Sequence, residues 1–100
     1  METQGIAEVI LYEILDLKSV NLQVTNLPTP ITLNPTYASI LIIQNNSGSV
    51  VYFGPLGALN LQLPANGGVF TLAMPLGKKI DLSKLFLVST TNVTVTVMYA

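Results

Sequence analysis

The sequence predicts a mainly β protein: an antiparallel β-sandwich or jelly-roll-like domain of about seven or eight short strands, preceded by an N-terminal α-helix. Three observations predict this fold. Apolar residues alternate with polar ones from residue 20 onward, and Gly, Pro and Asn interrupt that pattern every ~10 residues. Residues 3–18 have helical spacing instead. We therefore expect a helical extension over residues 1–18 and one β-sandwich domain over residues 19–100.

The first segment, TQGIAEVILYEILDLK, gathers its apolar side chains on one face of the expected helix. Four of the chain's five carboxylate side chains precede residue 17, and Lys18 closes the segment, an order that suits the helix dipole. A short helix is marginal alone, so this face must pack on the chain's own sheet or on a partner. The candidate oligomer or docking interface consists of Ile6, Ile10, Ile14 and Leu17.

The remaining residues form short runs with the period of a β-strand. Residues 20–25 alternate, and the prolines at 28 and 30 end that strand. Residues 39–44 are almost continuously apolar, which is typical of a strand covered on both faces. After an Asn-Asn-Ser-Gly turn, residues 49–53 return, so the two runs predict a hairpin. Further strands are expected at residues 31–33, 59–63, 69–74, 78–81, 85–88 and 93–99. No helical crossover separates the strands, which excludes an all-parallel sheet.

The composition excludes several classes of function. Only 9% of the residues are charged, and the chain contains no Arg, His, Cys or Trp. Nucleic-acid binding needs clustered basic residues, and nucleophilic triads usually need a histidine. Asp81 is the only acid after residue 16, too few for a carboxylate pair or an oxygen-ligand metal site. No apolar stretch is long enough to span a bilayer. We expect a non-enzymatic protein with no catalytic, cofactor or metal site and no nucleic-acid or membrane partner.

Low charge also predicts self-association. A chain with 50% hydrophobic residues and a net charge of −1 would be poorly soluble as a monomer, so part of its surface is expected to be buried in a homo-oligomer. The alternative is a carbohydrate- or receptor-binding module. Tyr37 and Tyr52, which lie near turns, are the candidate ligand-facing aromatic residues.

Residues 40–54, ILIIQNNSGSVVYFG, resemble a recurring pattern in small virion proteins of tailed bacteriophages and related viruses. LPANGG at 63–68, IDLSKLFL at 80–87 and the closing Val-Thr strand agree with it in order, and VNLQVTNLP at 20–28 resembles the segment that precedes this module. The resemblance implies a β-sandwich virion component of the head-decoration, fibre or tail-associated type, with other virion proteins as partners. By analogy with decoration and fibre proteins, a trimer is the first expectation for the homo-oligomer. Its location would be the virion, and the host cytoplasm before assembly. It implies no catalytic residue.

Overall fold

Alternating apolar residues form short β-strands throughout residues 17–100, the part of the chain that the computed structural model describes. The strands are β1 (Lys18–Val24), β2 (Thr29–Pro30), β3 (Tyr37–Ala38), β4 (Ile40–Asn45), β5 (Val51–Pro55), β6 (Leu61–Leu63), β7 (Gly68–Ala73), β8 (Ile80–Asp81), β9 (Leu85–Val88) and β10 (Val93–Tyr99). One 3-10 turn, η1 (Leu82–Lys84), connects β8 to β9. The expected mainly β, antiparallel fold is confirmed.

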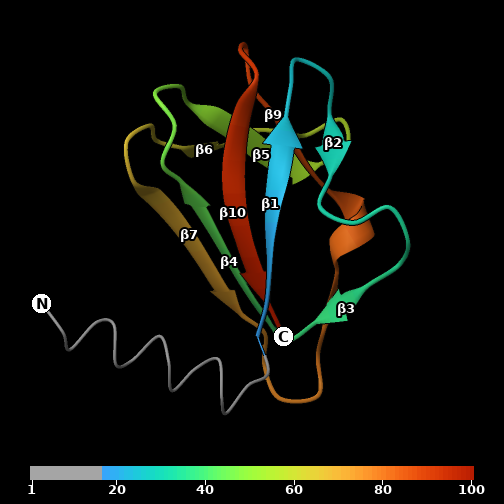
Figure 1. The fold of residues 1–100 in the computed structure, drawn as a ribbon. Helices are drawn as coiled ribbons and strands as arrows, with labels where there is room; N and C mark the ends of the chain where they lie inside the picture. Colours follow the sequence, from blue (N-terminus) through green and yellow to red (C-terminus); the bar gives the residue numbers. More distant parts are fainter. Residues whose placement is uncertain (1–16) are drawn as a thin grey trace, which may run out of the picture.

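The strands form three antiparallel sheets. Sheet A has the order β1-β10-β4-β7, sheet B the order β2-β9-β5-β6, and a small third sheet pairs β3 with β8. Figure 1 shows sheet A as the near layer, with β5, β6 and β9 behind it. The first and last strands are neighbours, because all seven residues of β1 pair with β10, from Lys18 opposite Tyr99 to Val24 opposite Val93.

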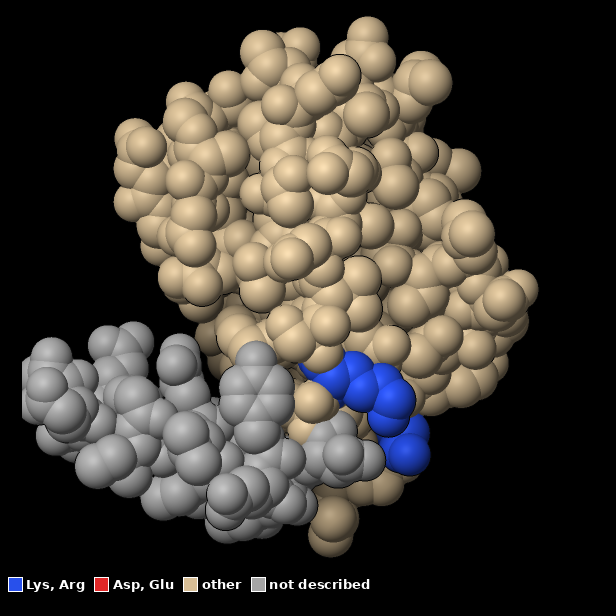
Figure 2. Space-filling view, viewed as in Figure 1, with Lys and Arg blue, Asp and Glu red and all other residues tan. Residues whose placement is uncertain are grey.

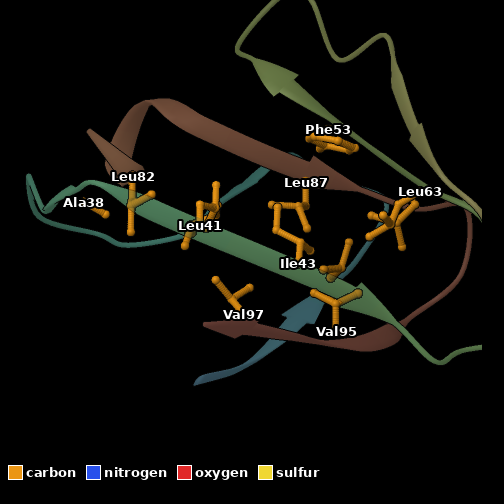
Figure 3. Packing of buried hydrophobic residues seen from close by; sticks show 12 residues of the cluster. Ala38, Leu41, Ile43, Phe53, Leu63, Leu82, Leu87, Val95 and Val97 are labelled. Atoms are coloured by element: carbon orange, nitrogen blue, oxygen red, sulfur yellow. The ribbon is translucent and has the colours of Figure 1, made fainter. Parts of the chain in front are cut away.

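Sheets A and B contribute to a single hydrophobic core. On sheet A the buried side chains include Leu41 and Ile43 of β4, and on sheet B they include Phe53 of β5 and Leu87 of β9. Figure 3 shows these side chains pointing toward one another between the two sheets. The Phe53 ring meets the edge of Phe70 from β7, with ring centroids 4.8 Å apart. Burial of large apolar side chains of this kind stabilises a domain by about 1.5–3 kcal/mol each.

The predicted hairpin at residues 39–53 is wrong. β4 and β5 lie in different sheets: β4 pairs with β10 and β7, whereas β5 pairs with β6 and β9. The Asn45 side chain explains why the chain passes from sheet A to sheet B after β4. Its amide nitrogen donates to the carbonyl oxygens of Ser49 (2.8 Å) and Leu63 (3.1 Å). Those bonds turn the chain away from sheet A and fix it beside β6 of sheet B.

Two further differences concern strand boundaries. The short strand expected at residues 31–33 is replaced by β2, two residues earlier, where Thr29 and Pro30 pair with β9. Proline is tolerated there because β2 is an edge strand. Lys18, expected to end the helix, instead begins β1, and Leu17 before it is buried. The remainder of the expected helix, including Ile6, Ile10 and Ile14, lies outside the described residues.

Candidate functional site

Charge gathers at one end of residues 17–100, which we call the lysine end. Lys18 begins β1, and Lys78 and Lys79 lie in the connection that follows β7 at the same end of sheet A. Lys84 lines a shallow depression together with Lys79. All four lysines are exposed. Figure 2 shows lysine atoms only in the lower part of the face it presents and, among the described residues, no acidic atom on that face.

Asp81 is the single acid among residues 17–100, and it is a structural cap. Its Oδ1 atom accepts hydrogen bonds from the Ser83 hydroxyl (2.8 Å), the Ser83 amide (3.0 Å) and the Thr36 amide (3.2 Å). The bond from the Ser83 hydroxyl, then the two amides and the nearby Lys84 charge, hold the pKa of Asp81 below its ordinary value of 3.8, although partial burial acts in the opposite direction. Asp81 and Ser83 thus stabilise the turn that connects β8 to β9.

The opposite end contains no charged residue and is held together by neutral side chains. Asn45 is fully buried there, and its Oδ1 atom accepts from the Ser47 hydroxyl (2.6 Å) and the Ser47 amide (3.1 Å). Ser49 and Thr91 join two further turns through their hydroxyls (2.8 Å). No buried polar side-chain atom between residues 17 and 100 lacks a hydrogen-bond partner.

The outer face of sheet A carries no charge. Along each strand, residues whose side chains lie on this face alternate with residues whose side chains lie in the core. The apolar residues of the outer face include Ile40 and Ile42 of β4. Both isoleucines are only half-buried, so the cover expected on both faces of this apolar strand is absent from the outer side within the described residues. The full set of outward positions is Ser19, Asn21, Gln23, Ile40, Ile42, Gln44, Val69, Thr71, Ala73, Thr94, Thr96 and Met98.

The edges of the two large sheets differ. The edge strands of sheet B are short and next to prolines: β2 has two residues and ends at Pro30, and β6 has three and is followed by Pro64. The edge strands of sheet A are β1, with seven residues, and β7, with six, and neither contains a proline. Proteins commonly protect edges by keeping them short or by placing proline or charge on them. Sheet B has that protection. On the edge strands of sheet A, Lys18 is the only residue that is charged or a proline.

The two candidate aromatic residues belong to different sheets. Tyr37 lies in β3 opposite Asp81 and is 63% exposed. Tyr52 lies in β5, half-buried, opposite Gln62 and Val88. The described residues contain no group of three or more potential metal-ligating side chains. Among these residues no helix is long and apolar enough to cross a membrane.

Comparisons with known proteins identify no relative. No protein-family model, no curated protein and no solved structure matches the chain.

Proposed function

We propose that this chain is a non-catalytic structural protein that works by assembling with copies of itself, as a component of a virion formed in the host cytoplasm. The observation that carries the proposal is the distribution of charge. Four lysines and one aspartate share one end of residues 17–100, and the outer face of sheet A has none. Such a surface is suited to close contact with neutral protein and poorly suited to remaining solvated. The virion assignment rests on the resemblance of residues 40–54 and 63–68 to small phage virion proteins.

The finer fold that we propose is a β-sandwich. Sheets A and B share one core, and their edge strands lie in corresponding order, with β1 and β2 on one side and β7 and β6 on the other. Such a domain is what the resemblance to virion components of the head-decoration, fibre or tail-associated type implies. Assembly of the whole chain, with a trimer as the first expectation, would bury the neutral surface.

Light scattering coupled to size-exclusion chromatography tests the assembly. We expect a defined oligomer whose mass does not change on dilution through the micromolar range. A stable monomer at high concentration would contradict the proposal. The virion assignment has an independent test, because antibodies against the purified chain should label intact particles of the virus that encodes it.

A second candidate function is recognition of a carbohydrate or a receptor, favoured by the exposure of Tyr37 at the lysine end. An exposed aromatic ring offers a stacking surface for a sugar. Glycan-array binding that disappears in Tyr37→Ala and persists in Tyr52→Ala would support this candidate. Binding that survives both substitutions, or no binding by the wild type, would contradict a role of Tyr37 and Tyr52 in recognising a ligand.

A further inference from the structure

The direction of the backbone groups on β1 follows from one pair of hydrogen bonds at the end of sheet A. Ile40 and Ala100 exchange two backbone bonds, each 3.1 Å. In an antiparallel ladder such doubly bonded pairs alternate with unbonded ones. On β10 the even-numbered residues therefore face β4, and the odd-numbered ones, such as Val97 opposite Val20, face β1. The odd residues of β1 must point their amides and carbonyls away from the sheet.

Six backbone groups are thus left on the open edge of β1, an N–H and a C=O on each of Ser19, Asn21 and Gln23. None of them takes part in a backbone hydrogen bond elsewhere in residues 17–100. Thr25, the next odd residue, confirms the direction, because its carbonyl points off sheet A and accepts from the Ser89 amide of the chain after β9 (2.9 Å).

The other edge of sheet A has the same arrangement. On β4 the odd residues face β7, so Leu41 and Ile43 are bonded to Leu72 and Phe70. The amides and carbonyls of Val69, Thr71 and Ala73 then point outward from β7, and nothing among the described residues bonds to them. Both edges therefore have three donors and three acceptors at the same two-residue spacing.

We infer that copies of this chain join edge to edge, with β1 of one copy antiparallel to β7 of the next, so that sheet A continues through the contact. This inference rests on the proposed assembly function and names its contact. The register follows from the free groups: Ser19 pairs with Ala73 of the next copy, Asn21 with Thr71, and Gln23 with Val69. Each pair exchanges two backbone hydrogen bonds.

The pleat of the two strands agrees with this register. Ser19, Asn21 and Gln23 point their side chains to the outer face, as do their new partners Val69, Thr71 and Ala73. On the inner face Val20, which is 42% exposed at the edge, would lie beside Leu72 of the next copy. Directly opposite apolar side chains on a sheet stabilise the pairing. One contact of this kind covers both open edges of every copy, except at the ends of an open array.

A second copy is the occupant that best fits the edge. β1 and β7 run in opposite directions within sheet A, because β1, β10, β4 and β7 are successively antiparallel. Copies placed side by side in the same orientation therefore meet with the antiparallel geometry already in place. Sheet B has no equivalent contact, since its edges are short and flanked by Pro30 and Pro64.

Proline substitutions test the contact. Proline at 21 or 71 removes an outward N–H that the isolated fold does not use, and Asn21→Ala and Thr71→Val are controls that keep it. We expect Asn21→Pro and Thr71→Pro each to be monomeric, with the dissociation constant raised ~100-fold or more. A mixture of the two should form a heterodimer, because β7 of the first variant and β1 of the second are intact. The two controls should assemble like the wild type.

Each other outcome has a separate meaning. A Thr71→Pro variant that still dimerises would overturn the β1–β7 contact in favour of a symmetric one through β1. Full assembly in both folded proline variants would overturn edge pairing while leaving the assembly function intact. A monomeric wild type would contradict both proposals. Circular dichroism establishes whether each proline variant is folded.

Hydrogen exchange of the wild type keeps the contact testable if a proline variant fails to fold. We expect the amides of Ser19, Asn21, Gln23, Val69, Thr71 and Ala73 to be protected in the oligomer. They should exchange at least 10-fold faster once dilution below the micromolar range has produced monomer. Val20 and Leu72, bonded within the chain, serve as internal references. Rapid exchange of the six amides in the intact oligomer would overturn the inference.

Discussion

Asn45 shows how one buried polar side chain decides the path of the backbone. Its amide nitrogen donates to three carbonyl oxygens, those of Ser49, Leu63 and Pro64, and its Oδ1 atom accepts from Ser47. The residue connects the end of β4 in sheet A to the start of β5 and the end of β6 in sheet B. A signal in the sequence could have identified it: Asn45 has the same parity as Leu41 and Ile43, both buried, at the end of their strand.

Replacing Asn45 should therefore destabilise the domain strongly. Asn45→Ala removes the donor to one buried and two part-buried carbonyl oxygens, and leaving a buried acceptor without a partner costs about 1–3 kcal/mol. We expect the free energy of unfolding to fall by about 3 kcal/mol, measured by urea denaturation. The adjacent Asn46 is exposed, so Asn46→Ala should change it by less than about 0.5 kcal/mol. Equal stability of the two variants would contradict the role given to Asn45.

Asp81 makes the stability of the domain depend on pH in a definite direction. Its pKa in the folded chain lies below 3.8, chiefly because the Ser83 hydroxyl donates to the carboxylate. The folded state therefore binds its proton less readily than the unfolded state does. The stabilisation is complete above the unfolded pKa and is lost as the pH falls through the folded pKa.

Asp81→Asn should remove that dependence. Below pH 3.8 we expect wild-type stability to fall more steeply than that of the variant, and above it the two slopes should agree. Thermal unfolding at a series of pH values measures both curves. Because acids in residues 2–16 are present in both proteins, their contribution cancels. Parallel curves throughout the acid range would show that Asp81 does not titrate as proposed.

At the scale of the element, strands were easier to predict than their partners. β10 could be predicted because apolar and polar residues alternate along it, and β4 because it is a continuous apolar run. Both patterns arise because successive side chains of a strand point to opposite faces of the sheet. Pairing depends on contacts between distant residues. The hairpin predicted from the turn at residues 45–48 was therefore wrong, and the open edges of β1 and β7 became visible only with the sheet order. Nothing local distinguishes an edge strand from a central one when both alternate.

Gly54 in β5 supports a close approach between that strand and the loop after it. Its φ is 149°, a conformation that glycine adopts readily, and a Cβ atom there would overlap the carbonyl oxygen of Ala58. We expect Gly54→Ala to lower the free energy of unfolding by about 2 kcal/mol, measured by chemical denaturation. Gly48 has open space around its Cα atom, so Gly48→Ala should be nearly neutral. A neutral Gly54→Ala would show that the loop moves aside without cost.

At the scale of the whole molecule, the two signs of charge occupy different parts of the chain. Residues 17–100 carry four lysines and one aspartate, a side-chain charge of 4 − 1 = +3, and residues 1–16 carry the other four acids, so the sum is −1. Copies joined in one orientation would gather their lysine ends on the same side of the assembly. The acids of residues 1–16 are joined to that side through Lys18 and would reduce the repulsion.

Removing residues 1–16 tests this balance. We expect the shortened chain to assemble more weakly than the full chain at low ionic strength and to recover at about 0.5 M salt, where charges are screened beyond a few ångströms. Sedimentation velocity across a salt series measures the change. A loss that salt does not restore would point instead to an apolar contact through Ile6, Ile10 and Ile14. Unchanged assembly would contradict both explanations.

The position of β10 between β1 and β4 has a consequence for synthesis. The strand made first in the described domain, β1, finds its neighbour only after residues 93–99 have been translated, because Lys18 pairs with Tyr99. β4 has one neighbour, β7, earlier and the other only at the end. Pairings so distant in sequence form slowly, typically in milliseconds to seconds. Sheet A is therefore completed late: β1 and β4 stay unjoined until β10 has been made and enters between them.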